Sequence, residues 1–94
     1  TDDPVVNSLK ERIVAEVHTI DPVLTIHDFR VVAGPTHTNV IFDLLLPYQF
    51  RLRDEAVVKQ LKDFVSNLEG HQYFAVIQVD HSYVGAAEKA QKEE

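Results

Sequence analysis

Histidines and carboxylates recur in this chain beside segments that predict β-strands. The densest group runs from His27 through His37 to Asp43, and Asp80 and His81 follow a later apolar segment. The chain has no cysteine, which excludes thiolate metal sites and thiol catalysis. Imidazole and carboxylate groups are the ligands that zinc, manganese and iron take in the absence of sulfur. The sequence therefore predicts a site for a divalent cation.

Length and charge limit the other classes of function. A chain of 94 residues allows one domain with one modest core, and 45% hydrophobic residues is too many for a disordered chain. The net charge of -6 repels phosphate backbones, which argues against nucleic-acid binding. No segment approaches the roughly 20 apolar residues of a membrane-spanning helix. Since the chain holds no methionine at all, we expect it to be a fragment of a longer protein.

The first half of the chain predicts a helix followed by a β-hairpin. Apolar residues recur at spacings of three and four from Val6 to Ile20, after Asp3 as a capping residue. Residues 23–32 and 38–46 are rich in β-branched and aromatic residues, and the turn residues between them predict a hairpin. This half should therefore read helix, strand, strand.

The second half predicts another helix and a third strand. Asp54 is the expected cap of this helix and Gly70 its left-handed end. Residues 73–79 form the expected third strand, which should run parallel to the second because a helix connects them. The predicted fold is an α+β, two-layer αββαβ domain over residues 1–84, with a polar tail at residues 85–94.

Alternation along the strands divides the predicted sheet into two faces. One face of the second and third strands should pack against the helices, which leaves Asp43 and Asp80 together on the other, open face. Strict alternation in the first strand places His27 on the face of Phe29, so His27 reaches these carboxylates only beside a β-bulge or at a strand end. The open face also carries more apolar surface than a monomer usually exposes, which predicts a partner subunit; its apolar residues are Ile41, Leu45, Phe74 and Val76.

Four features together carry a resemblance to a known family. They are the sequence His27-Asp28-Phe29-Arg30 opening a strand, Gly34-Pro35-Thr36 in the turn, a polar position late in the next strand, and an acidic position near the end of the last strand. The chain resembles, from the first helix to Tyr83, the C-terminal cytosolic domain of cation diffusion facilitator metal transporters. The resemblance implies a ferredoxin-like or metallochaperone-like fold.

The resemblance also implies a function. The domain would be a regulatory and dimerisation domain, not an enzyme, on the cytoplasmic side of a membrane and attached to the membrane-embedded domain of the same transporter. Two copies would form a homodimer and bind a divalent metal near their interface, zinc first, with manganese or iron as alternatives. A metal that binds the closed dimer more tightly than the open one would shift the equilibrium toward the closed dimer by the ratio of the two affinities. This shift would bias the membrane domain toward its active arrangement.

The ligands that the resemblance implies depart from the family pattern. His27 matches the family's histidine, whereas Asp43 and Asp80 lie near positions that are commonly histidine. An acidic residue commonly follows two places after the last of these, but Ser82 stands there. We add His81 and His37 as supporting candidates. Aspartate in place of histidine makes the site richer in oxygen and shifts its preference from zinc toward manganese or iron.

Two other interpretations remain open. The domain is a metal-independent dimerisation module if Arg30 neutralises Asp28 or Asp43 through a bidentate bond, or if histidines pair with the carboxylates. A stand-alone small-molecule sensor of ferredoxin-like fold is a third class. Catalysis has little support, because the chain contains no Gly-rich phosphate loop and no nucleophile or metalloprotease motif.

Overall fold

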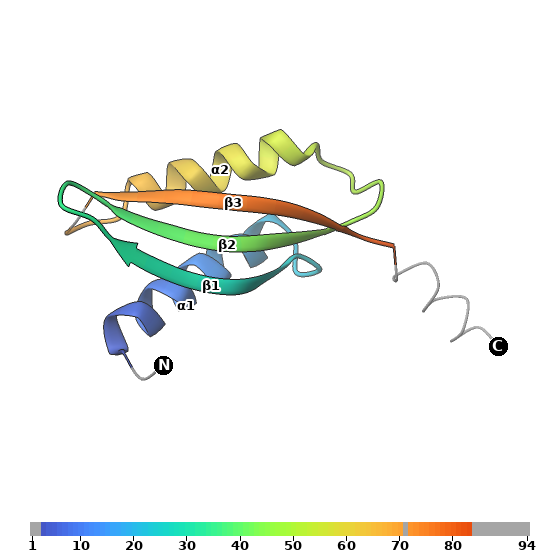
Figure 1. Ribbon diagram of the computed structural model, residues 1–94. Helices are drawn as coiled ribbons and strands as arrows, with labels where there is room; N and C mark the ends of the chain where they lie inside the picture. The colour runs from blue at the N-terminus through green and yellow to red at the C-terminus, as the bar shows by residue number, and fades with distance from the viewer. Residues whose placement is uncertain (1–2, 71, 84–94) are drawn as a thin grey trace.

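Two helices cover one face of a three-stranded sheet in the computed structural model, which describes residues 3–70 and 72–83 (Figure 1). The α+β class and the αββαβ order are confirmed, and this architecture is compatible with a two-layer ferredoxin-like domain. None of the helices in the described ranges is long and apolar enough to cross a membrane. The predicted polar tail lies outside the described residues. The elements are α1 (Pro4–Ile20), β1 (Thr25–Ala33), β2 (Thr38–Pro47), α2 (Asp54–Ser66) and β3 (Tyr73–Ser82).

Helix α1 begins at the predicted cap. The Asp3 carboxylate accepts hydrogen bonds from the backbone N–H of Val5 at 2.9 Å and of Val6 at 3.3 Å, which satisfies two of the free donors of the first turn. Pro4 fills the first helical position, where a missing N–H costs nothing. The buried side chains of α1 are Leu9, Ile13 and Val17, as its apolar spacing predicts.

Removing this cap should have a measurable cost. We expect Asp3→Ala to lower the free energy of unfolding by about 1 kcal/mol, because two N–H groups lose their acceptor. Urea denaturation of the two proteins measures the difference. Glu11→Ala, on the exposed side of the same helix, is the matched control and should change stability by less than about 0.5 kcal/mol. Equal effects of the two substitutions would contradict the assigned role of Asp3.

The sheet has the strand order β1-β2-β3, with β1 antiparallel and β3 parallel to β2. The central strand β2 buries every second side chain completely against the helices. These side chains are Val40, Phe42, Leu44 and Leu46. The helix-facing residues of β3 were also predicted correctly: Tyr73 is buried, and Ala75, Ile77 and Val79 are half-buried. Within residues 3–70 and 72–83, no helix covers the opposite face of the sheet.

A β-bulge interrupts β1 at Asp28. His27 pairs with Asp43 and Arg30 with Ile41, so two residues of β1 lie opposite Phe42 alone. Asp28 has a φ of 53°, a left-handed conformation that aspartate tolerates better than most residues. The extra residue turns Phe29 toward the helices, where its ring lies 6.2 Å from that of Phe42. The bulge therefore keeps both His27 and Arg30 on the open face.

The ends of α2 differ from the prediction. Asp54 is the first helical residue, and the capping position belongs to Arg53, which makes no side-chain capping bond. The helix ends at Ser66, short of Gly70, because the Asn67 side chain donates to the Asp63 carbonyl at 2.7 Å and closes the last turn there. Gly70 does adopt the expected positive φ, of 102°, but in the loop that follows.

Candidate functional site

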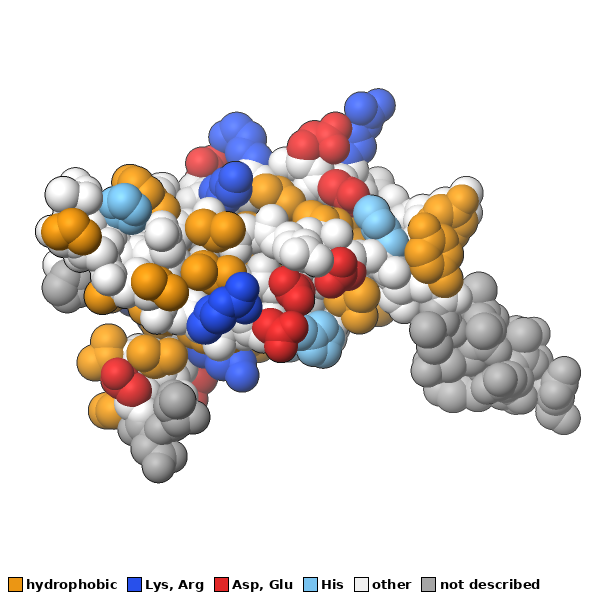
Figure 2. Space-filling model, in the orientation of Figure 1, with side chains coloured by type: hydrophobic (Ala, Val, Ile, Leu, Met, Phe, Trp, Pro, Cys, Tyr) orange, Lys and Arg blue, Asp and Glu red, His pale blue; other side chains and the backbone are white. Residues whose placement is uncertain are grey.

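The open face of the sheet is divided into two zones (Figure 2). Red carboxylate side chains gather over the middle of the sheet, and orange apolar side chains lie toward the turn between β1 and β2. We call Asp28, Asp43 and Asp80 the acidic zone. We call Val32, Ile41, Phe74 and Val76 the apolar zone.

Asp43 lies at the centre of the acidic zone. Its partial burial raises its pKa first, and a side-chain hydrogen bond with Asp28 raises it further. The negative charges of Asp28 and Asp80 act in the same direction, whereas the Arg30 guanidinium lowers the pKa. Asp28 and Asp80 are therefore close enough to Asp43 to disfavour its charge, and a bound cation would relieve that repulsion.

His27 lies next to this zone because of the bulge. It pairs directly with Asp43 across the antiparallel ladder, a position in which Cβ atoms are typically about 5 Å apart. Its Nε2 atom is 3.3 Å from the Thr25 hydroxyl, and the side chain is exposed. The bulge in β1 therefore places His27 on the same face as Asp43, which strict alternation alone would not do.

Sequence reasoning missed Asp28 as a member of the site. Alternation alone does not place Asp28 beside Asp43, so the sequence predicts its carboxylate only as a possible partner for Arg30. The left-handed backbone at the bulge accompanies the placement of the Asp28 carboxyl group close enough to Asp43 to raise its pKa. The one available signal was that aspartate is among the few residues that adopt this conformation readily.

Arg30 does not neutralise a carboxylate in the predicted way. Its Nη1 donates to the backbone carbonyl of Asp28 at 3.0 Å, not to a carboxylate oxygen. Among the residues that the structure describes, no ion pair involves Arg30. Arg30 thus affects the pKa of Asp43 through its charge, and the alternative of a bidentate pair with Asp28 or Asp43 is not found among the described residues.

Two predicted ligands lie away from the acidic zone. His37 stacks on Phe74 with ring centroids 4.6 Å apart, at the turn end of the open face. His81 alternates to the helix side of β3, where its Nε2 lies 2.8 Å from an Asp54 carboxylate oxygen. The structure therefore places His27 opposite Asp43 and Asp80 near Asp43 on the open face, whereas His37 and His81 lie away from them.

The arrangement in one chain does not make a complete metal site. Within residues 3–70 and 72–83, no group of three or more histidine, aspartate or glutamate side chains is placed to hold one metal ion. A cation at the acidic zone would need rotated side chains or ligands from another molecule.

The apolar zone is unusually exposed for its residue types. Val32, Phe74 and Val76 are 51%, 48% and 47% exposed. Val32 lies on β1 and the other two on β3, on either side of the half-buried Ile41 of β2. A cluster of exposed apolar side chains on one face is typical of a binding surface for another protein.

No protein-family model matches this chain, and neither does any curated protein or any solved structure. Its function must be inferred from its own residues.

Proposed function

We propose that this chain is the cytosolic regulatory and dimerisation domain of a divalent-cation efflux transporter of the cation diffusion facilitator type. Two copies meet through their open faces and bind a metal at the acidic zones, zinc first, with manganese or iron as alternatives. The observation that carries the proposal is the position of His27 opposite Asp43, with Asp28 and Asp80 beside it on the uncovered face. The motif resemblance supplies the class of protein.

The chemistry of the acidic zone supports a cation as its ligand. Three carboxylates share one face, and one of them is partly withdrawn from water. A buried or crowded carboxylate requires a positive partner, and no ion pair with Lys or Arg supplies one for this zone within the described residues. One imidazole with several carboxylates suits zinc, and also manganese and iron.

The incompleteness of the site in one chain supports a second copy as the partner. Two open faces brought together would bury the apolar zones and set two acidic zones near each other. The carboxylates would repel one another until a cation bound between them, and each copy would supply ligands that the other lacks. Metal binding then favours association by mass action, which is the coupling that a regulatory domain needs.

Sedimentation of the chelator-stripped domain, with and without zinc, tests this proposal. We expect zinc to shift the protein from monomer toward dimer at concentrations where the metal-free form is mostly monomeric. A distribution that does not respond to zinc or manganese would contradict metal-linked dimerisation.

We further predict that Val76→Arg will weaken the dimer by at least about tenfold, because it places a strongly hydrated charge in the apolar zone. Dilution series in the centrifuge, with zinc present, measure the dissociation constant. Val23→Arg is the matched control, since Val23 is 55% exposed but precedes β1 and lies outside the open face. The same loss of dimer in both variants would exclude the apolar zone as the interface.

The alternative is a dimerisation module that binds no metal. The observation in its favour is that the described chain places no three ligands around one point. This alternative predicts a dimer that forms in the presence of chelator and keeps its dissociation constant when zinc is added. The same sedimentation experiment therefore separates the two functions.

A further inference from the structure

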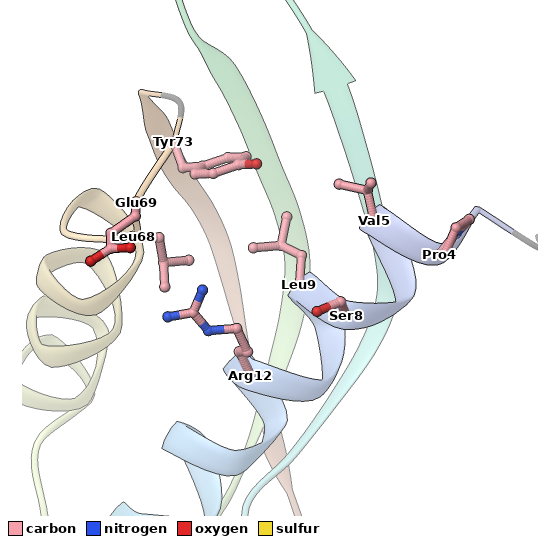
Figure 3. Close-up of a pocket in the computed structure, with 8 residues that line it drawn as sticks. All are labelled: Pro4, Val5, Ser8, Leu9, Arg12, Leu68, Glu69 and Tyr73. Carbon is pink, nitrogen blue, oxygen red and sulfur yellow. The ribbon is translucent and has the colours of Figure 1, made fainter.

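A second candidate site lies on the helix side of the sheet, away from the acidic zone (Figure 3). It is a pocket of about 290 Å³ between the first turns of α1, the loop after α2 and the start of β3. Its buried lining is apolar and comprises Leu9, Leu68 and Tyr73. Val5, which is 65% exposed, extends the apolar wall to the mouth.

Two opposite charges line the same pocket. Arg12 projects from α1 toward the loop that follows α2, and Glu69 lies in that loop (Figure 3). Neither side chain makes an ion pair or a hydrogen bond with any residue in the described part of the chain. Ser8 lies on α1, one turn before Arg12, and also lines the pocket (Figure 3). The pocket therefore combines an apolar floor with one cationic and one anionic group that are free to bind a ligand.

We propose that this pocket binds a small zwitterion with an apolar body, namely an apolar α-amino acid. The carboxylate of the ligand pairs with Arg12, its ammonium group with Glu69, and its side chain lies against Leu9, Leu68 and Tyr73. This ligand class matches both charges and the floor at once, which is how small-molecule pockets fix orientation.

Size and charge exclude the neighbouring ligand classes. The volume is at the small end of the roughly 300–1,000 Å³ of ligand pockets, so it takes a single amino acid and not a longer chain. Glu69 repels a ligand that carries only negative charge, such as a fatty acid or a phosphate. Arg12 likewise disfavours an apolar amine that lacks a carboxylate. The inference goes beyond the proposed function, because it involves neither the open face nor a metal.

Titration of the ¹⁵N-labelled domain with L-phenylalanine, followed by NMR, tests the inference. We expect saturable shifts of the amide signals of residues 5–12 and 68–69. Two analogues test the two charges: 3-phenylpropionate lacks the ammonium group and phenethylamine lacks the carboxylate, and each should bind at least about tenfold more weakly. Binding of either analogue as tightly as L-phenylalanine would overturn the zwitterion assignment. Absence of saturable shifts up to about 10 mM would overturn the site itself.

Two variants test the residues. Arg12→Gln should weaken L-phenylalanine binding by at least about tenfold, because a charge-assisted bond to the carboxylate is lost. Lys10→Gln, on the same helix but outside the lining, should leave the affinity unchanged. Thermal unfolding gives an independent readout. If Arg12 serves only to stabilise the fold, Arg12→Gln lowers the melting temperature and leaves L-phenylalanine binding unchanged, which would contradict the proposal.

Discussion

Asp43→Asn is expected to weaken zinc binding by about 100-fold while leaving the fold intact. Asp43 lies opposite His27 and close to Asp28 and Asp80, so its carboxylate is the group nearest to the other residues of the candidate site. Asparagine keeps the shape of the side chain but offers a neutral oxygen, which is a much poorer ligand for zinc. Competition with a chromophoric chelator measures the affinity. Glu55→Gln, on the exposed side of α2, should leave it unchanged.

The same substitution should stabilise the metal-free domain at neutral pH. The pKa of Asp43 is raised by partial burial and by Asp28, so the folded state holds the proton more tightly than the unfolded chain does. The stabilisation from protonated Asp43 is present at acid pH and is lost as pH rises from the ordinary aspartate pKa through the raised one. Asparagine carries no charge at any of these pH values, so Asp43→Asn should not lose stability in this way as pH rises. Urea denaturation of both proteins in the presence of chelator, from acid to neutral pH, measures this difference. A lower free energy of unfolding for Asp43→Asn than for the unsubstituted protein at neutral pH would contradict the account.

Asp80→Ala separates the metal-binding account from the metal-independent one. Asp80 is exposed, and its carboxylate is 3.4 Å from the Gln78 amide, so its removal should not disturb the core. A lower zinc affinity with unchanged unfolding supports a metal at the acidic zone. Unchanged zinc affinity would remove Asp80 from the site.

Phe42→Ala is expected to cost about 3–5 kcal/mol of unfolding free energy, the largest effect on stability that we predict. Phe42 is fully buried in the central strand, and its ring stacks on Phe29 at the bulge. The substitution leaves a cavity beneath the segment that holds His27 and Asp28 in place. Since small domains have only about 5–15 kcal/mol in total, much of the protein should unfold under mild denaturation.

Urea denaturation followed by circular dichroism measures this loss. Phe42→Leu is the matched control, because it keeps most of the volume and should cost less than about 1.5 kcal/mol. A cost of about 1 kcal/mol or less for Phe42→Ala would mean that the ring does not hold the bulge against the helix layer.

Periodicity predicted the architecture well because burial decides it. The apolar spacing of α1 and the alternation in β2 and β3 match the side chains that the structure buries between the helices and the sheet. The ends of α2 were predicted poorly, because contacts of individual side chains decide them. Asp54 bonds to His81, 27 residues away, and Asn67 closes the helix through its own amide. Local helix propensity predicts neither of these contacts.

The candidate site was predicted in part for the same reason. Asp43 and Asp80 were assigned to one face by alternation, and the structure places them there. Alternation placed His27 with the carboxylates only if it lay at a strand end or beside a bulge, and it could not decide between these conditions. The bulge that the structure shows also places Asp28 beside Asp43. His81 was assigned beside Asp80 by adjacency, although neighbouring residues in a strand point to opposite faces.

Calorimetric titration of the chelator-stripped domain with zinc, near neutral pH, tests the central claim most directly. Imidazole binds a metal ion in its deprotonated form, which is why the titration is done near neutral pH and not in acid. The account predicts saturable heat at about one or two ions per chain, and loss of that heat in Asp43→Asn. No heat with zinc or manganese, together with no competition against a chelator, would contradict metal binding and leave a metal-independent dimerisation module as the better description.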